Sequence, residues 1–325
     1  MLTGGKPRVD LSVVVPVYDA EQTIAALVQQ LLDAYRPRGP MQVVLVNDGS
    51  RDRSHEICLE LAEKFPDAVT YLRLAKNFGE HNAVMAGLRY AQGAYVVVMD
   101  DDFQHRPEDA LRLYDEARTK GFDLVYSYFP RREHGLGRRL GSGFNSWVAN
   151  FMLDKPKDLY LSSFKCMSRW LVREIVRYRG PFPYVDGLAL RCTRNVGRLE
   201  VVHRPREVGR SGYTLRKLVA LWGSMFVSFS VMPLRVSTLL GFVLIGLAAA
   251  GSVYVLWEKL AGRSVPEGWP FLAIIIMLFS GAQLLTLGIV GEYLGRLYLV
   301  INETPQAVVR DSWGLGAPGA RRDDA

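Results

Sequence analysis

The sequence predicts an α/β domain built on a mixed, mainly parallel β-sheet, followed by helices that lie in a membrane. Three observations predict this class: Val-rich runs alternate with helical patterns over residues 11–128, an acidic cluster follows the fourth run, and two long uncharged apolar runs come later. A chain of 325 residues can hold one full domain and roughly one hundred residues more. The chain therefore need not form a single fold.

Five short apolar runs predict the strands, and amphipathic stretches between them predict the helices. Near-continuous apolar strands separated by helices are typical of a parallel sheet covered on both faces. Ligands of such sheets bind at the carboxyl ends of the strands. The expected strands are residues 11–17, 41–47, 69–75, 94–100 and 122–128, and the expected helices are residues 20–35, 52–65, 79–92 and 107–120.

The formal net charge is +7, with a pI near 9.3. Such a charge fits nucleic acid, anionic lipid or a phosphorylated substrate. No zinc-finger spacing, RNA-binding aromatic signature or lysine-rich tail occurs, so we expect no nucleic-acid binding. The cysteines lie far apart without a Cys-x-x-Cys pair, which indicates a reducing compartment. No signal-peptide pattern opens the chain, so the first domain is expected in the cytoplasm.

Two uncharged apolar runs, residues 236–257 and 271–290, are each long enough to cross a hydrocarbon layer of roughly 30 Å. A buried core hairpin is the alternative, but Trp257 and Trp269 occupy positions typical of membrane interfaces. Basic residues lie outside the two runs, which by the positive-inside rule places both ends in the cytoplasm. These residues are Arg216, Lys217, Arg235 and Arg296.

The expected organisation has six parts, and residues after Asp311 are expected to be disordered because they are Gly-rich and charged. The parts are a cytoplasmic catalytic domain (1–214), a juxtamembrane amphipathic segment (215–235), a transmembrane helix (236–257), an external loop (258–270), a second transmembrane helix (271–293) and a cytoplasmic C-terminal tail (294–325).

Residues 136–153 predict a further amphipathic helix with a Trp- and Phe-bearing face and a basic start. It either packs on the domain or lies in a membrane surface, and both interpretations stay open. The basic residues are Arg131, Arg132, Arg138 and Arg139.

The fourth strand ends in three consecutive acids, within the run VVVMDDDFQHRPE. Like charges this close are costly unless a cation joins them. In extended chain, Asp100 and Asp102 would face one pocket and Asp101 would face away. Carboxylates without His or Cys suit a hard cation, Mg²⁺ or Mn²⁺. A single acid would suffice to cap the helix that Pro107 opens, so three acids favour a metal site.

The second strand is followed by VNDGSRDRS, a tight turn over residues 47–50. On its own this is ordinary turn chemistry. At the ligand-binding edge of the sheet, however, Asp48 is placed to accept hydrogen bonds from a base or a ribose.

Three motifs carry a family resemblance: PVYDAE after the first strand, VNDGSRDRS after the second, and NFGEHNAVMAGLRYAQGAYVVVMDDDFQHRPED around the fourth. With the two C-terminal apolar runs, they resemble the polyprenyl-phosphate glycosyltransferases of glycosyltransferase family 2. This group includes dolichol-phosphate mannose synthases and bacterial enzymes that charge undecaprenyl phosphate with a sugar. The resemblance covers about residues 11–310 and implies a glycosyltransferase A-type domain that binds a nucleotide-sugar.

The resemblance also implies roles for individual residues. Pro16, Tyr18 and Asp48 would line the nucleotide pocket, with Glu21 as the nearest acid to a position where many relatives have glutamate. Asp100, Asp102 and Gln104 would form the Mg²⁺ or Mn²⁺ motif. The basic segment HRPREVGRSGY resembles a loop that closes on the diphosphate, which nominates Arg206, Arg210 and Ser211. Relatives often have Ser-Lys where this chain has Ser211-Gly212, and an acid or glycine where Ser162 and Ser163 stand.

The implied reaction is an inverting transfer from a nucleotide-sugar, a UDP-sugar by family preference, to undecaprenyl phosphate. Asp100, Asp102 and Arg206 would act on the departing diphosphate, and Arg131, Arg132 and Arg138 would hold the acceptor phosphate. The expected place is the bacterial inner membrane, in cell-envelope or lipopolysaccharide modification, with the bilayer as partner and a homo-oligomer left open. The alternatives are a polysaccharide-extending synthase of the same family, whose Gln-x-x-Arg-Trp motif is missing here, and a catalytically silent partner of a lipid-sugar flippase.

Overall fold

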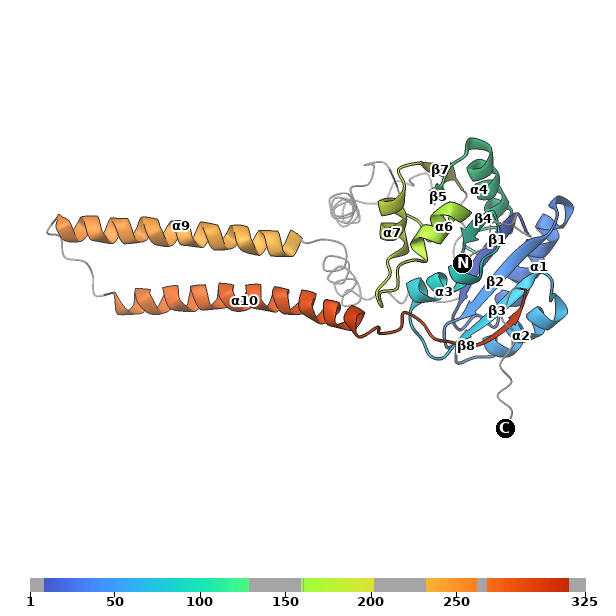
Figure 1. Ribbon diagram of the computed structural model, residues 1–325, viewed down its shortest axis with the longest axis horizontal. Helices are drawn as coiled ribbons and strands as arrows, with labels where there is room; N and C mark the ends of the chain where they lie inside the picture. The colour runs from blue at the N-terminus through green and yellow to red at the C-terminus, as the bar shows by residue number, and fades with distance from the viewer. Residues whose placement is uncertain (1–8, 129–158, 160, 202–231, 262–267, 316–325) are drawn as a thin grey trace. The chain divides into compact units, whose positions relative to one another are not determined.

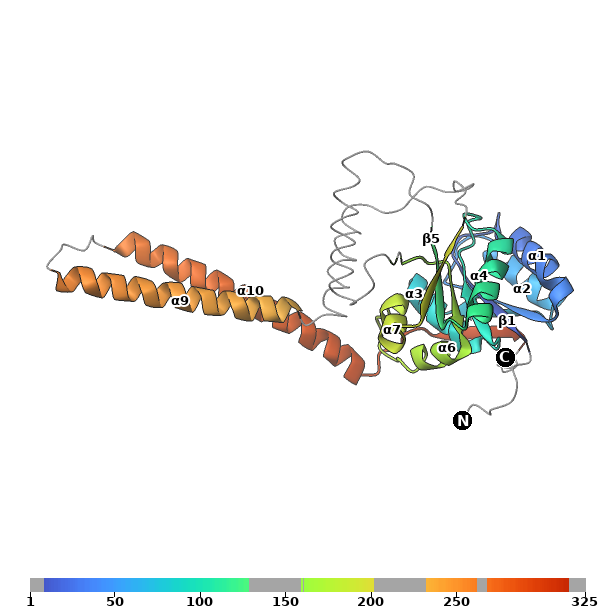
Figure 2. The same ribbon diagram turned by 90° about the horizontal axis from the view of Figure 1, so that it is seen from above.

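A computed structural model describes residues 9–128, 159, 161–201, 232–261 and 268–315. The chain divides into two compact units, shown in Figures 1 and 2. The first unit comprises residues 1–212 and 304–325, and the second comprises residues 213–303. Segments far apart in the sequence thus build the first unit together.

An eight-stranded sheet forms the centre of the first unit, in the order β7-β5-β6-β4-β1-β2-β3-β8. Strands β1, β2, β3 and β4 pair in parallel, as the sequence predicts. Strand β6 inserts between β4 and β5 and runs antiparallel to both. The strands are β1 (Leu11–Val17), β2 (Met41–Asn47), β3 (Val69–Leu74), β4 (Tyr95–Val98), β5 (Leu124–Tyr128), β6 (Lys165–Ser168), β7 (Val196–Glu200) and β8 (Val309–Gly314).

Helices cover both faces of this sheet and create two apolar cores (Figure 2). Successive strand residues point to opposite faces, so Val13 and Val15 enter one core while Val14 enters the other. One face carries α1 (Ile24–Tyr35), the 3-10 turn η1 (Arg36–Arg38), α2 (Ser54–Lys64) and α4 (Pro107–Lys120). The other carries α3 (Glu80–Tyr90), α6 (Arg169–Ile175) and α7 (Val185–Cys192).

The C-terminal segment returns to the sheet, which corrects the prediction of disorder directly after Asp311. Residues up to Gly314 belong to β8, which pairs antiparallel with β3. The Trp313 ring stacks on the Tyr71 ring with centroids 5.1 Å apart. The Leu315 carbonyl accepts a 2.6 Å hydrogen bond from the Thr70 hydroxyl. The prediction of disorder rested on composition, which contains no information about the edge of β3. That edge offers backbone hydrogen-bond partners to a short strand.

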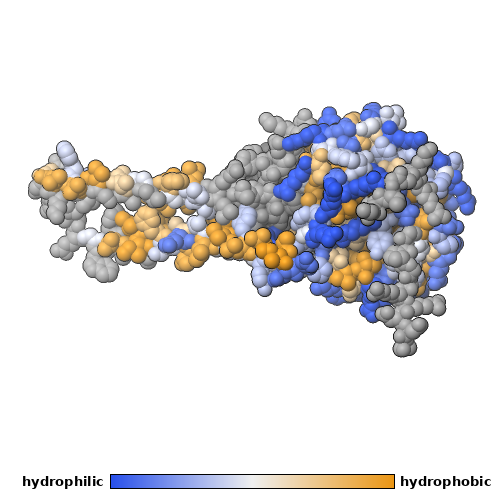
Figure 3. All heavy atoms as spheres, viewed as in Figure 1, coloured by the Kyte–Doolittle hydropathy of each residue, from blue (hydrophilic) through white to orange (hydrophobic). Residues whose placement is uncertain are grey.

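The second unit contains two long helices, α9 (Met232–Leu260) and α10 (Trp269–Ile301). Apolar side chains lie along the described parts of both (Figure 3). Within the described residues, one stretch, Leu278–Ile301, is long and apolar enough to cross a membrane, and none of it is buried. The apolar stretch Ser237–Gly251 in α9 is shorter. The stretch Leu278–Ile301 therefore supports the second predicted transmembrane helix, although it lies farther toward the C-terminus than residues 271–293. The two-span arrangement stays a prediction.

Several predicted features lie outside the described residues. These are the helix over residues 136–153, the juxtamembrane segment up to residue 231, and two sets of candidate polar residues. The sets are Arg131, Arg132, Arg138 and Arg139, and Arg206, Arg210 and Ser211.

Candidate active site

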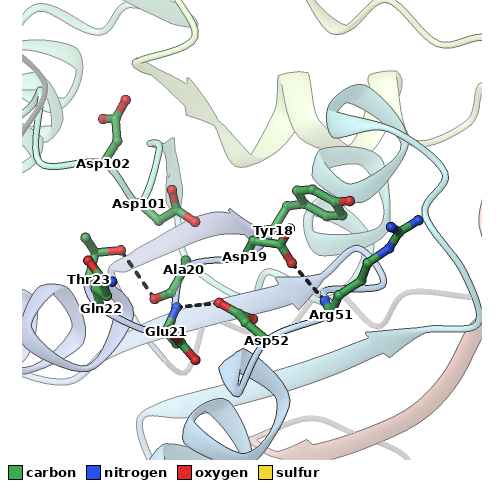
Figure 4. Close-up of a pocket in the computed structure, with 10 residues that line it drawn as sticks. All are labelled: Tyr18, Asp19, Ala20, Glu21, Gln22, Thr23, Arg51, Asp52, Asp101 and Asp102. Atoms are coloured by element: carbon green, nitrogen blue, oxygen red, sulfur yellow. Dashed lines mark hydrogen bonds between the residues drawn. The ribbon is translucent and has the colours of Figure 1, made fainter. Parts of the chain in front are cut away.

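A pocket of about 480 Å³ lies at the carboxyl ends of β1 and β4, where the parallel topology predicts a ligand site (Figure 4). Three chain segments line it: the loop after β1, the turn after β2 and the acidic turn after β4. The Tyr18 side chain is 46% exposed, so its ring is accessible to a ligand. The lining residues are Tyr18, Asp19, Ala20, Glu21, Gln22, Thr23, Arg51, Asp52, Asp101 and Asp102.

Reciprocal hydrogen bonds hold the first two of these segments together. The Asp19 carboxylate accepts a bond from the Arg51 backbone N–H at 2.8 Å, and the Asp52 carboxylate accepts one from the Glu21 N–H at 3.0 Å. The Glu21 carboxylate accepts in turn from the Arg53 N–H at 3.1 Å. Asp19 adopts a left-handed φ of 53°, a conformation that Asp tolerates better than most residues. Glu21 therefore fixes the wall of the pocket.

Asp48 is buried, and both of its carboxylate oxygens accept backbone hydrogen bonds. The Phe78 and Gly79 N–H groups donate to them at 2.7 and 2.8 Å. Burial raises the pKa of Asp48, and these two bonds oppose the rise. The following Gly49 has a φ of 72°, and a Cβ there would lie 2.7 Å from the Asn77 nitrogen. Asp48 thus ties the turn after β2 to the loop before α3.

The acidic turn begins where β4 ends, at Val98. The prediction that Asp101 faces away from the pocket is wrong, since Asp101 and Asp102 both line it. Asp100 instead accepts a 2.7 Å hydrogen bond from the Ser163 hydroxyl. Simple strand alternation fails here because the chain has left the sheet and turns sharply, with Phe103 at a φ of 57°.

The charges of this turn fit a cation. Burial, followed by the charges of Asp100 and Asp102, raises the pKa of Asp101 to about 7. The Asp102 carboxylate accepts a bond from the Gln104 backbone N–H at 3.1 Å, which folds the turn back on itself. Among the described residues, no group of three His, Cys, Asp or Glu side chains is arranged as a ready metal cage. Two or three oxygen ligands suit Mg²⁺, which usually completes its shell with water and substrate phosphates.

A polar cluster lies beside Asp100 on the α3 and α7 side of the sheet. The buried Lys165 ammonium pairs with the buried Asp186 carboxylate, which also accepts a 2.8 Å bond from the Tyr126 hydroxyl. Part of the Glu80 side chain is exposed to solvent, but its carboxyl group lies close to other protein atoms. The resulting desolvation is the main cause that raises the pKa of Glu80 to about 7, and the charge of Asp100 is the second cause. Burial lowers the pKa of the neighbouring His81. Beside the acidic turn the structure therefore places a buried ion pair and a second acid, Glu80, whose pKa is raised as that of Asp101 is.

Comparison with known proteins assigns the chain to a family. Residues 12–177 match the family model described as glycosyl transferase family 2. The chain belongs to glycosyl transferase family 2. This assignment confirms the resemblance found in the sequence motifs, and the matched residues contain the whole pocket and the acidic turn of this family 2 glycosyltransferase.

Its curated relatives cover nearly its full length. An undecaprenyl-phosphate 4-deoxy-4-formamido-L-arabinose transferase of Pectobacterium atrosepticum is 32% identical over 95% of both chains. An uncharacterized glycosyltransferase of Bacillus subtilis is also 32% identical, over 97% of this chain and 98% of its own. Among solved structures, glucosyl-3-phosphoglycerate synthase of Mycobacterium tuberculosis in complex with UDP matches with a TM-score of 0.48 and 17% identity, over 68% of this chain and 79% of that chain.

The structure brings together some of the predicted site residues of this family 2 protein. Tyr18, Glu21 and Asp102 line the pocket, Asp100 and Gln104 belong to the same acidic turn, and Pro16 is partly buried in β1. The sequence motifs gave no role in the site to several residues that the fold places here. Asp19, Arg51 and Asp52 come from the two linked loops, Ser163 comes from the segment before β6, Lys165 from β6 and Asp186 from α7.

A signal existed for the first three residues, because they directly follow strands at the ligand-binding edge. For Ser163 the sequence marked only a departure from the acid or glycine of relatives, which does not predict a contact with Asp100. Ser163 reaches Asp100 because β6 runs antiparallel beside β4 with Lys165 opposite Val98, and continuing this register places Ser163 opposite Asp100.

Proposed function

We propose that this protein transfers a sugar from a nucleotide-sugar, with a UDP-sugar as the first candidate, to undecaprenyl phosphate, with inversion at the anomeric carbon. One observation carries the proposal: the crowded acidic turn over residues 100–102 faces a pocket whose other walls are the nucleotide-side loops of a family 2 domain. The name of the Pectobacterium relative supports undecaprenyl phosphate as the acceptor.

The nucleotide is proposed to lie in the pocket, with its base near the exposed Tyr18 ring and its diphosphate toward the acidic turn. Asp100, Asp102 and Gln104 are the residues that would hold Mg²⁺ or Mn²⁺. The bound cation would neutralise the negative charge that develops on the departing diphosphate. Ser163 orients the Asp100 carboxylate through its 2.7 Å bond, so this ligand does not need to reorganise during transfer.

The acceptor needs positioning more than it needs a general base. A phosphomonoester has its second pKa near 6, so the attacking oxygen is largely ionised at neutral pH. Repulsion between the acceptor phosphate, the donor diphosphate and the acids must then be offset by cations. We assign the acceptor phosphate to Arg131, Arg132 and Arg138, and the diphosphate to Arg206, Arg210 and Ser211.

The acceptor assignment is tested by replacing arginine with lysine. Guanidinium binds phosphate in a bidentate way that ammonium does not reproduce, so Arg131→Lys should strongly reduce transfer while membrane association and donor binding persist. A membrane-surface arginine would instead tolerate lysine. If lysine variants of Arg131, Arg132, Arg138 and Arg139 all transfer sugar at the parent rate, these arginines bind lipid headgroups and the acceptor site lies elsewhere.

The same proposal places the protein in the bacterial cytoplasmic membrane, with two spans and a cytoplasmic catalytic unit. The Leu278–Ile301 window supports one span, and the first would lie within α9. Cysteine labelling in spheroplasts should reach Arg263→Cys from outside and Arg310→Cys only after permeabilisation. Labelling of both positions from the same side contradicts the hairpin.

The decisive experiment is mass spectrometry of undecaprenyl phosphate after incubation with full-length protein, Mn²⁺ or Mg²⁺ and a panel of nucleotide-sugars. A mass increase of one sugar unit with one donor is expected, with release of the nucleoside diphosphate. Asp102→Asn provides the matched inactive control. If the lipid stays unmodified with every donor while a soluble glycan is extended, the protein is a polysaccharide synthase. Absence of nucleotide release under all conditions identifies a silent partner.

A further inference from the structure

Two aromatic side chains on the α6 and α7 side of the catalytic unit are exposed without serving the pocket. Trp170 is 51% exposed and Phe182 is 45% exposed. Among the described residues of this unit, the other large apolar side chains with comparable exposure are Tyr18 at the pocket and Val308. Aromatic side chains such as Trp and Phe are enriched at interaction surfaces.

Arginines lie close to these aromatic residues along the chain. Positions 170 and 173 share one side of α6, while Leu171, Val172 and Ile175 face the core, and Arg177 follows the end of the helix. Residues 169–182 contain four arginines and one acid, Glu174, so the segment carries a net charge of +3. Arg177 pairs with Glu174 at 2.6 Å and keeps a side chain that is 76% exposed. We name Trp170, Arg177, Arg179 and Phe182 the α6–α7 patch.

A second cation lies behind this patch. The Arg89 guanidinium donates to the Gln306 side-chain oxygen at 2.6 Å, and partial burial, with the charge of Arg179 second, lowers its pKa. Among the described residues, no carboxylate forms an ion pair with Arg89 or Arg179. Two neighbouring guanidinium groups without a matching acid favour an anionic partner.

The loop that carries Arg179 and Phe182 is hydrogen-bonded to the segment that precedes β8. The buried Gln306 side chain donates a 2.8 Å hydrogen bond to the Gly180 carbonyl, two residues before Phe182. The Gln306 side chain thus bonds both to Arg89 and to the loop that carries Arg179 and Phe182, which fixes this loop on the catalytic unit.

We propose that the α6–α7 patch docks on the anionic surface of the bilayer, with Trp170 and Phe182 at the headgroup level and Arg177 and Arg179 on lipid phosphates. This inference rests on the proposed membrane function and deepens it by assigning the face of the catalytic unit that meets the lipid. Amphipathic aromatic rings and arginines are the side chains that membrane interfaces select. Each arginine near an anionic surface strengthens docking by about fivefold.

The test uses full-length protein in nanodiscs of phosphatidylglycerol or of phosphatidylcholine. A nitroxide label is placed at Glu174→Cys, which leaves Trp170 and both patch arginines in place. Cys192 is replaced by serine because it is exposed, whereas Cys58 and Cys166 are buried. The control label is Asp33→Cys on α1, which lies on the opposite side of the catalytic unit from α6 and α7 in both views (Figures 1 and 2). Collisions with oxygen report lipid exposure, and collisions with a water-soluble nickel complex report water exposure.

The label at position 174 should be lipid-exposed in phosphatidylglycerol and the label at position 33 water-exposed in both lipids. Adding Trp170→Ala and Phe182→Ala should return the first label to water, and Arg179→Gln should shift docking by about fivefold. Equal water exposure of the two labels in phosphatidylglycerol overturns the proposal. Dipolar coupling between the labels at position 174 of two chains also overturns it, because the patch would then contact a second copy of the chain. Sugar transfer and Arg263→Cys labelling are measured on the same preparations. A protein that transfers sugar with an undocked patch refutes the inference alone, whereas a docked but inactive protein refutes the proposed function alone.

Discussion

Replacing Asp101 by asparagine should stabilise the metal-free protein although it alters the acidic motif of the family. Asp101 lies between two other carboxylates, and burial together with their charges raises its pKa from 3.8 to about 7. In the unfolded chain this carboxyl loses its proton near its ordinary pKa. Between these two values the folded state holds more protons, so stability falls as the pH rises through this window and stays low above pH 7.

The size of the effect follows from that pKa difference. Three pKa units correspond to roughly 4 kcal/mol, and partial solvent access reduces this figure to about 2–4 kcal/mol at pH 8. Asn removes the charge and the repulsion while keeping a similar shape. For a unit of this size, each kcal/mol moves the melting temperature by about 2–4 °C. At pH 5 the parent carboxyl is largely protonated in the folded state, so less than half of the difference should remain.

Thermal unfolding in detergent with EDTA, followed by intrinsic fluorescence at pH 5 and pH 8, measures both predictions. Addition of Mn²⁺ at pH 8 should raise the melting temperature of the parent more than that of Asp101→Asn, because a cation offsets the charge that the variant lacks. A variant with an equal or lower melting temperature at pH 8, or the same gain at both pH values, refutes the electrostatic account of the turn.

Three further substitutions probe the metal motif, the buried ion pair and the C-terminal strand. Asp102→Asn should retain the fold but lower sugar transfer by about a hundredfold or more, and near-normal turnover with Mg²⁺ or Mn²⁺ would contradict the metal assignment. Lys165→Met leaves the Asp186 carboxylate buried without its cation and should lower the free energy of unfolding by about 3–5 kcal/mol, measured by chemical denaturation. The double variant Lys165→Met/Asp186→Leu should recover much of this loss. A single variant as stable as the parent would show that the pair is dispensable. Trp313→Ala should lower the free energy of unfolding by about 1–3 kcal/mol and speed hydrogen exchange in β3. Arg310→Ala, at an exposed position of β8, is the matched control. Unchanged exchange in β3 would show that β8 does not stabilise this edge of the sheet.

Local sequence patterns predicted the elements of the fold correctly where burial is simple. The Val-rich runs of β1, β2 and β4 are buried on both faces, so their composition alone identifies them as central strands. The pocket edge followed from the same logic, since polar residues after parallel strands meet there. Short strands β6 and β8 carry mixed polar residues and escaped prediction, because their place in the sheet depends on neighbours far away in the sequence.

The sequence by itself determined the family, the ligand-binding edge of the sheet and the acids that crowd it, because motifs and strand composition are local properties. Only the tertiary structure decided which way those acids point. The chain leaves β4 at Val98 and turns, so Asp101 enters the pocket and Asp100 meets Ser163. It also decided that the C-terminal segment closes the sheet and that Gln306 binds the α6–α7 loop. These contacts join residues separated by sixty or more positions, where the outcome depends on strand register and packing, and no local pattern encodes either.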